Sequence, residues 1–194
     1  MKMVDNAATT PPGREIVWSA VQWPACEHLD LRADTEGVVA DGVVVGVIDG
    51  VATRLRYHVA CDVGWNVRSV SIDLHGHPPV SLTRQGDRWH DGAGIERADL
   101  AGCTDVDIAV TPFTNTIPIR RLRLGGGESA DIRVLYIEPT PELQITAESQ
   151  RYTRLPTGYR YRSGTFTADL EVDGDGIVVD YPQLWTLRRS SGAA

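Results

Sequence analysis

The sequence predicts a mainly β, single-domain protein with one short helix. Short segments in which apolar and polar residues alternate run through most of the 194 residues, and Gly, Pro and Asp separate them. Turn-separated segments of this kind form antiparallel sheets. Because no internal repeat or low-complexity linker marks a second domain, we expect a flexible segment at 1–14, one domain at 15–188 and a frayed tail at 189–194.

The N-terminal half is predicted to be a series of strands joined by short turns. Residues 16–23 and 28–33 alternate imperfectly and read as two strands with a tight connection. The next run, 37–48, is rich in valine, and its Asp41-Gly42 favours a hairpin or a bulge at that point. Asp49-Gly50 supplies a further turn. The strand-like segments that follow are 52–61, 66–74, 80–83, 87–90 and 95–100.

The central segment, Cys103–Leu124, changes from a strand to a helix. Its first half alternates as a half-buried strand does. The alternation stops at Pro112, which has no N–H to donate to a sheet. Cap-type side chains at Thr114-Asn115-Thr116 then precede Pro118, which a helix tolerates in its first turn. We therefore expect one short helix here.

The last third is predicted to be an antiparallel meander. Two strands, 130–137 and 143–147, come first, and the prolines at 139 and 141 bound them. Turn formers then separate the remaining segments, and Asp173-Gly174-Asp175-Gly176 is the clearest of these turns. The strands of the meander are 150–155, 159–162, 166–172 and 177–181.

Composition and charge indicate a soluble protein that does not bind nucleic acid. Hydrophobic residues make up 42% of the chain, and no apolar run is long enough to span a membrane. A net charge of −7 disfavours DNA and anionic membranes as partners, although Arg120, Arg121 and Arg123 leave room for a local basic patch. The first residues carry no secretory signal, so we expect a cytoplasmic location. Cys26, Cys61 and Cys103 are expected to be buried free thiols.

Four segments of the chain resemble the bacterial family named Putative glycolipid-binding. They are VQWPACEHLDL, the central DLAGCTDVDIAVTPFTNTIPIRRLRL, ESQRYTRL and DGDGIVVDYPQLW, so the resemblance covers about the whole chain. It implies a curved sheet, a spiral β-roll or half-barrel similar to the lipoprotein carriers of bacteria, wrapped around a central helix. It also implies an amphiphilic lipid or glycolipid as the ligand. The absence of a secretory signal distinguishes this chain from carriers that work in the periplasm.

A carrier for an amphiphile needs an apolar interior for the tails and a polar rim for the head group. Arginine grips phosphate or carboxylate with two hydrogen bonds, and aromatic residues with a polar tip suit the boundary between apolar and wet surroundings. An alternative is that the aromatic residues are cross-strand pairs and that the arginines pair with Asp105 and Asp107. The candidate ligand-binding residues are Arg120, Arg121, Asn115, Tyr152, Tyr159, Tyr161, Tyr181 and Trp185.

The competing function is a hydrolytic enzyme acting on a sugar-bearing or lipid substrate. Asp105 and Asp107 share a strand face, so their carboxylates could stand about 6 to 7 Å apart, as in glycosidase pairs. No nucleophile elbow, phosphate-binding loop or dinucleotide motif is present, and His75 and His77 lack a third metal ligand. We expect a non-enzymatic binding protein with no cofactor, metal or nucleic acid and no insertion into a membrane. The oligomeric state is left open.

Overall fold

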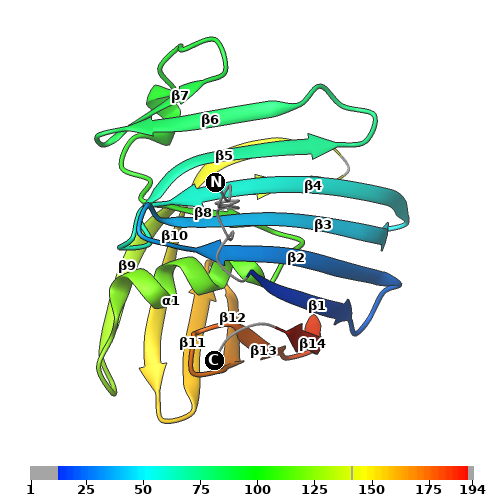
Figure 1. Ribbon diagram of the computed structural model, residues 1–194, viewed down its shortest axis with the longest axis vertical. Coiled ribbons are helices and arrows are strands. Elements are labelled where there is room, and N and C mark those ends of the chain that lie inside the picture. Colours follow the sequence, from blue (N-terminus) through cyan, green and yellow to red (C-terminus); the bar gives the residue numbers. More distant parts are fainter. Residues whose placement is uncertain (1–12, 141, 192–194) are drawn as a thin grey trace, which may run out of the picture.

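A computed structural model describes residues 13–140 and 142–191. They form one 14-stranded sheet in the order β7-β6-β5-β4-β3-β2-β1-β14-β13-β12-β11-β10-β9-β8, in which β7 and β8 are the two edges, so the sheet is curved but not closed (Figure 1). Neighbouring strands are antiparallel except β8 and β9, which run parallel. The predicted mainly β fold with one short helix is confirmed. Residues 1–12 of the flexible segment expected at 1–14 lie outside the described residues.

The strands are short in most of the sheet and longest in β3, β4 and β10. Their bounds are β1 (Arg14–Ala20), β2 (Ala25–Ala33), β3 (Val38–Ile48), β4 (Val51–Cys61), β5 (Val67–Leu74), β6 (Val80–Gln85), β7 (Arg88–Asp91), β8 (Asp105–Ile108), β9 (Ser129–Glu138), β10 (Gln144–Leu155), β11 (Gly158–Ser163), β12 (Phe166–Val172), β13 (Val178–Tyr181) and β14 (Trp185–Ser191).

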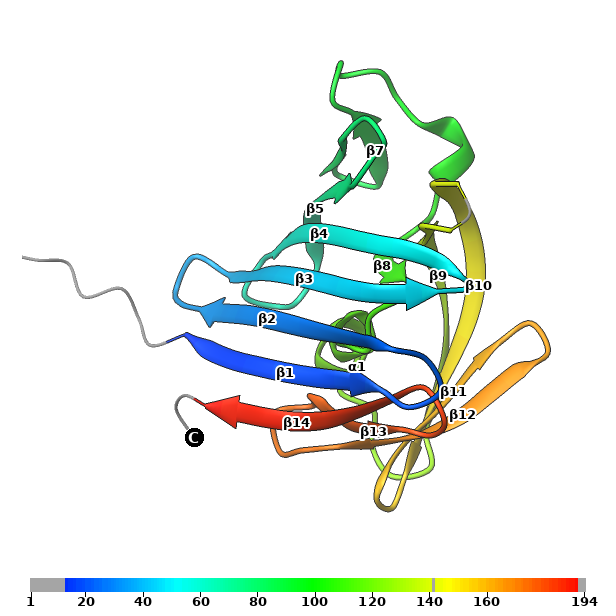
Figure 2. The ribbon, with the colours of Figure 1, turned by 90° about the vertical axis from the view of Figure 1, so that its right-hand side faces the viewer.

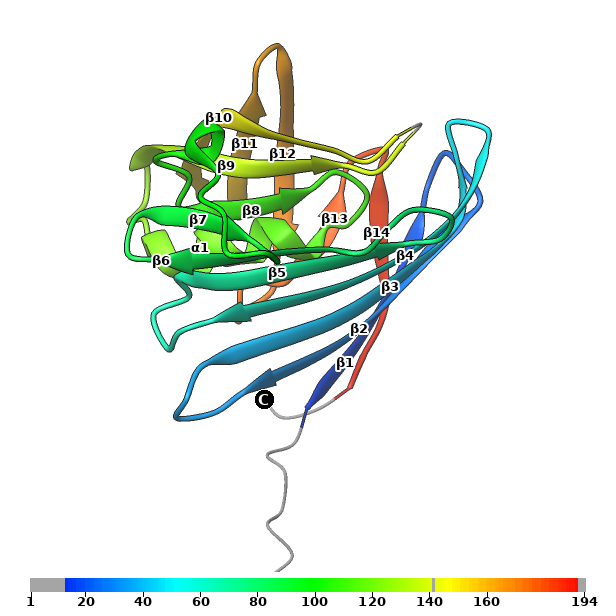
Figure 3. The ribbon, with the colours of Figure 1, turned by 90° about the horizontal axis from the view of Figure 1, so that it is seen from above.

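The sheet folds over so that its two halves face each other. One wall is formed by β1 to β5 and the other by β9 to β12, and the helix α1 (Thr116–Leu122) lies between them (Figures 2 and 3). The turns η1 (Ala98–Leu100) and η2 (Phe113–Asn115) are 3-10 helices. At one edge Trp89 of β7 donates its indole N–H to the carbonyl of Cys103 just before β8, at 3.0 Å. This contact brings the two edge strands near each other without joining them.

The helix α1 begins where the sequence predicts it. Pro118 is its third residue, where a missing N–H costs no helical hydrogen bond. Thr111 accepts the N–H of Phe113 at 3.0 Å and so starts the turn that leads into the helix. Asn115 makes no side-chain cap, because its carbonyl oxygen accepts the Tyr152 hydroxyl at 2.8 Å instead. The helix is therefore fixed by packing and by this side-chain bond more than by a cap.

The helix plugs the roll. Residues 113–119 are buried, and Phe113 stacks on Tyr57 with ring centroids 6.1 Å apart. Trp18 of β1 donates its indole N–H to the carbonyl of Val178 at 2.7 Å, which ties β1 to the start of β13. The largest side chains under 2% exposed belong to this core, among them Trp18, Trp89, Phe113, Leu55, Leu82 and Ile108. Core side chains therefore occupy space beside the helix where the sequence led us to expect an apolar hollow.

Asp41-Gly42 is not a turn, contrary to the prediction. β3 passes through it and pairs with β2 and β4 without a shift in register. A Cβ at position 42 would lie 2.0 Å from Cζ of Tyr57, so the glycine is there to admit the tyrosine ring. The turn predicted at Asp49-Gly50 is confirmed.

Four other expectations are corrected. The strands predicted at 143–147 and 150–155 are one strand, β10. Residues 95–100 contribute only an isolated bridge at Glu96 and the η1 turn. The frayed tail expected at the C-terminus is strand β14 up to Ser191, held by backbone pairing with β1, and 192–194 lie outside the described residues. Cys26 is exposed, because it lies on the outer face of β2, whereas Cys61 and Cys103 are buried as expected.

Candidate functional site

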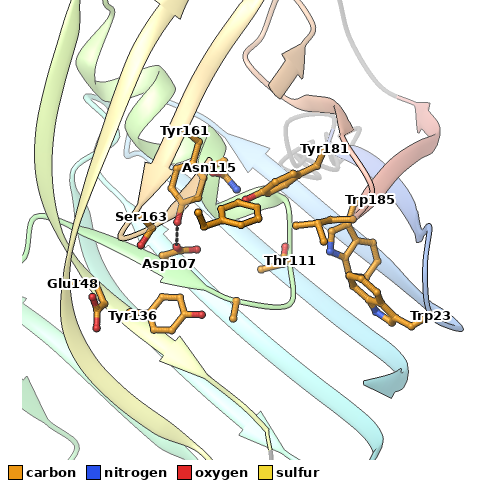
Figure 4. A pocket seen from close by; sticks show the side chains of 13 residues that line it. Trp23, Asp107, Thr111, Asn115, Tyr136, Glu148, Tyr161, Ser163, Tyr181 and Trp185 are labelled. Atoms are coloured by element: carbon orange, nitrogen blue, oxygen red, sulfur yellow. Dashed lines mark hydrogen bonds between the residues drawn. The ribbon is translucent and has the colours of Figure 1, made fainter. Parts of the chain in front are cut away.

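One pocket of about 410 Å³ opens beside the N-terminal end of the central helix (Figure 4). Strands β8 to β14, the segment before α1 and the β1–β2 connection all contribute to it, and we call it the aromatic pocket. Its lining residues are Trp23, Asp107, Ala109, Thr111, Asn115, Tyr136, Glu148, Tyr161, Ser163, Phe166, Tyr181, Leu184 and Trp185. Among these residues are six aromatic side chains and two acids, and none is basic. Such a lining combines apolar surface with groups that can form hydrogen bonds.

Asp107 of β8 is the most constrained polar group of the pocket. One carboxylate oxygen accepts the Thr114 hydroxyl at 3.0 Å, and the other accepts the Gln150 amide at 2.6 Å. The second oxygen also accepts the Tyr161 hydroxyl at 3.2 Å (Figure 4). Burial raises the pKa of Asp107, and the three hydrogen bonds offset part of this rise. Because its two oxygens already accept three hydrogen bonds, the Asp107 carboxyl group is held in one orientation and has limited freedom to move.

The aromatic walls of the pocket are formed by rings that touch one another. Tyr161 contacts Phe166 and Tyr181 with centroids 6.1 and 6.4 Å apart, and Trp23 meets Trp185 edge to face at 5.8 Å. Phe166 is 44% exposed and stands at the mouth. Burial, followed by the nearby charge of Asp107, raises the pKa of the Tyr161 and Tyr181 hydroxyls, so both stay protonated donors at neutral pH.

One buried polar group on the lining residues has no partner among residues 13–140 and 142–191. The indole N–H of Trp23 is buried and makes no hydrogen bond. The Tyr181 hydroxyl also lines the pocket, and as a protonated group it can donate to a ligand. An unpaired buried donor costs about 1 to 3 kcal/mol, so native proteins rarely keep one without a reason. A ligand with hydroxyl groups would supply the missing acceptor.

A second buried acid lies behind the pocket. Glu27 of β2 is fully buried, and one of its oxygens accepts both the Tyr57 hydroxyl at 2.5 Å and the Thr111 hydroxyl at 2.7 Å. Its other oxygen is buried without a partner. Burial raises the pKa of Glu27 from 4.5 to about 8, although the two hydrogen bonds lower it. Thr111 therefore links this carboxyl group to the lining of the pocket.

Asp105 does not belong to the pocket, because an arginine holds it in the core. Arg121 donates Nε to one oxygen of Asp105 at 2.9 Å and Nη2 to the other at 2.6 Å. Asp105 is 0% exposed. This pair is the alternative that the sequence left open for Arg121, and it fixes the helix to β8. A doubly bonded, buried Asp105 cannot act as the acid of a catalytic pair with Asp107.

The structure gathers half of the predicted ligand-binding residues at the pocket. Asn115, Tyr161, Tyr181 and Trp185 line it. Tyr152 lies behind Asn115, to which it donates its hydroxyl. The other three lie elsewhere: Arg121 is paired with Asp105, while Arg120 and Tyr159 line a groove near the C-terminal end of the helix.

Sequence reasoning missed several lining residues. Trp23 precedes Pro24 in a connection between strands, and Tyr136 and Glu148 alternate on strands whose inner face the sequence does not specify. Only the exposed Phe166 had a signal, a large apolar residue next to the turn at Gly164. In the described part of the chain, no group of three or more His, Cys, Asp or Glu side chains lies close enough together to hold a metal ion.

The described residues contain no helix with the length and apolar character that a membrane crossing requires. No protein with a curated description matches the chain. Among solved structures, the chain is similar to a DUF1089 family protein from Pseudomonas aeruginosa, with 36% sequence identity and a TM-score of 0.73, over 84% of this chain and 91% of that one. The model of the family described as "Putative glycolipid-binding" matches residues 15–187, so the chain belongs to this glycolipid-binding family.

Proposed function

We propose that the protein binds the neutral sugar head group of a glycolipid in the aromatic pocket. The observation that carries this proposal is the pairing of aromatic walls with the buried indole N–H of Trp23, which has no partner among the described residues, beside the oriented carboxylate of Asp107. A sugar ring has apolar C–H faces that pack against aromatic rings, and its hydroxyls both donate and accept hydrogen bonds. The family name supports the same class of ligand.

The charge of the pocket supports a neutral head group over an anionic one. Asp107 and Glu148 are both acids, and no lysine or arginine lines the pocket. A phosphate or carboxylate would be repelled there and would leave its charge unpaired. The volume of about 410 Å³ falls in the range of roughly 300 to 1,000 Å³ that small-molecule sites occupy.

The tails of such a glycolipid would lie at the mouth of the pocket. The interior beside α1 is occupied by core residues, so acyl chains have no apolar channel there. Exposed apolar side chains do stand near the mouth: Phe166 lines it, and Val21 is 52% exposed and donates its N–H to the carbonyl of Leu184. This proposal therefore differs from a carrier that encloses the whole lipid.

Hydrolysis is the weaker alternative. Asp105 is held by Arg121, and Asp107 already accepts three hydrogen bonds, so neither carboxyl is free to exchange a proton with a substrate.

A cytoplasmic location also stays a prediction of the sequence, which cell fractionation with an antibody would test.

Calorimetric titration with matched amphiphiles tests the proposal. Octyl glucoside and octyl phosphocholine share one alkyl chain, so a difference between them reports on the head group. We expect octyl glucoside to bind in the aromatic pocket, and we expect no binding of octyl phosphocholine that depends on Trp23. Trp23→Phe keeps the ring and removes the N–H donor, and we expect it to weaken octyl glucoside binding about 10-fold. Trp65→Phe, which lies outside the lining of the pocket, is the matched control and should bind octyl glucoside as the wild type does.

Octyl phosphocholine binding that Trp23→Phe weakens, or unchanged octyl glucoside affinity in Trp23→Phe, would contradict the proposal. A second measurement avoids the choice of probe: organic extraction of protein purified without detergent, followed by mass spectrometry. We expect a sugar-bearing lipid in the extract from the wild type and less of it from Trp23→Phe.

A further inference from the structure

An arginine-lined groove lies where α1 ends, away from the aromatic pocket. It has a volume of about 510 Å³. Arg120 and Arg123 come from the end of the helix and Arg154 comes from β10, and we call this feature the arginine groove. Arg121, the remaining member of the basic cluster in the sequence, turns to Asp105 instead. The other lining residues are Ile119, Leu124, Tyr159, Val172, Asp173, Gly174 and Gly176.

Arg120 is held in place by an aromatic ring. Its guanidinium carbon lies 5.4 Å from the centroid of the Trp65 ring. Trp65 has a φ of 66°, in the left-handed region that bulky residues avoid. The Asp62 carboxylate fixes this turn by accepting the N–H groups of Gly64 at 2.8 Å and Asn66 at 2.9 Å. Strain of this kind persists where the surroundings enforce it, and it is common at binding sites.

Arg154 is oriented in a similar way from the other wall. Its guanidinium carbon lies 4.7 Å from the centroid of the Tyr159 ring, and it donates to the carbonyl of Gly158 at 2.9 Å. Gly176 makes room for the first arginine, because a Cβ there would lie 3.2 Å from Cδ of Arg120. Both guanidinium groups are thus positioned before any ligand arrives, which lowers the entropy cost of binding.

The net charge of the groups around the groove is positive. Within residues 13–140 and 142–191, none of Arg120, Arg123 and Arg154 forms an ion pair. Asp173 lines the groove, and Arg14 pairs with both Asp173 and Asp175, so one guanidinium group is shared by two carboxylates. The end of α1 adds at most about half a negative charge. Three guanidinium groups therefore outweigh the local negative charge, in a protein whose net charge is −7.

We propose that the arginine groove binds a phosphate group. Guanidinium groups match the geometry of phosphate oxygens with parallel N–H bonds. Stacking on Trp65 leaves the N–H edges of Arg120 free for this role, and Arg154 uses only Nη1 on the carbonyl of Gly158. The acidic lining of the aromatic pocket disfavours anions, whereas the arginines of this groove favour them. The two sites would therefore take ligands of different charge, and the phosphate proposal does not depend on the sugar proposal.

Calorimetric titration with inorganic phosphate tests the groove directly. We expect millimolar or tighter binding by the wild type and a loss of about 10-fold or more in Arg120→Gln and in Arg154→Gln. Arg123→Gln removes an exposed charge of the groove without removing a stacked side chain. Weaker phosphate binding by this variant would therefore report the lost charge and not a disturbed fold. Arg56→Gln, an exposed arginine of β4 outside the groove, is the matched control and should keep wild-type affinity.

Sedimentation with vesicles identifies the source of the phosphate. Vesicles of phosphatidylcholine with or without phosphatidic acid are compared, using wild type and Arg120→Gln. Sedimentation that needs phosphatidic acid and Arg120 supports a phosphate carried by a lipid, whereas phosphate binding without sedimentation supports a soluble phosphate ester. Absence of phosphate binding up to about 10 mM, or equal affinity in all four variants, would overturn the proposal.

Discussion

The buried carboxyl of Glu27 should make the stability of this protein fall as the pH rises. Its pKa lies at about 8 in the folded protein, against an ordinary value of 4.5. The folded state therefore binds the proton more tightly than the unfolded state does. The stabilisation is complete below about pH 4.5 and is lost progressively as the pH rises to about 8. Glu27→Gln removes the titration while it keeps an acceptor for the Tyr57 and Thr111 hydroxyls.

The size of the effect follows from the shift of the pKa. In the window between the two pKa values, one such group lowers the free energy of unfolding by about 1.4 kcal/mol for each pH unit. From pH 5 to pH 8 the wild type should lose about 3 to 4 kcal/mol relative to Glu27→Gln. At pH 5 the two proteins should differ by less than about 2 kcal/mol, because the amide leaves one buried donor group unpaired.

Urea unfolding at several pH values, followed by tryptophan fluorescence, measures these free energies. Other titrating groups are common to both proteins, so the difference between the two curves isolates Glu27. The exposed Glu15→Gln serves as the control and should stay within about 0.5 kcal/mol of the wild type. Wild-type and Glu27→Gln curves that run parallel from pH 5 to pH 8 would refute the argument that burial keeps this carboxyl protonated.

Three further predictions follow from packing, pairing and exposure. Gly42→Ala should destabilise the protein by at least about 2 kcal/mol in urea unfolding, because its Cβ would lie 2.0 Å from the Tyr57 ring, and a neutral result would mean that the ring can move. Arg121→Met should cost about 3 to 5 kcal/mol in the same assay, since it leaves Asp105 buried without its partner, and a loss under 1 kcal/mol would contradict this role. Cys26 is exposed and the other two cysteines are buried, so Cys26 should react with a thiol reagent well before them, as measured by mass spectrometry. Equal labelling of all three thiols would contradict this difference in exposure.

The sequence predicts those parts of the fold that depend on neighbouring residues. Pro118 and the turn at Asp49-Gly50 act through their own backbone, so the helix and that hairpin are recognisable. Asp41-Gly42 has the same local signal, but a ring from the next strand decides what the glycine does. β14 has little local signal, because pairing with β1, far away in sequence, makes it a strand.

The candidate site depends still more on distant contacts. Asp107 and Tyr161 are 54 residues apart in sequence, yet they share a hydrogen bond. Their residue types allowed both to be singled out, one as a candidate acid and the other as a candidate aromatic contact, but the sequence offered no reason to join them. Trp23 lacked any signal, since its indole N–H is notable only because its surroundings provide no acceptor.

The central helix explains why this roll carries two small sites instead of one large cavity. Its seven residues span about 10 Å, and their burial fills the space where an open half-barrel would hold lipid tails. A pocket lies near each of its two ends. Asn115 precedes it at the acidic, aromatic end, and Arg120 and Arg123 lie at the basic end. The length of the helix separates the carboxylate of one site from the arginines of the other and so weakens the attraction between them, which lets each site select a ligand of different charge.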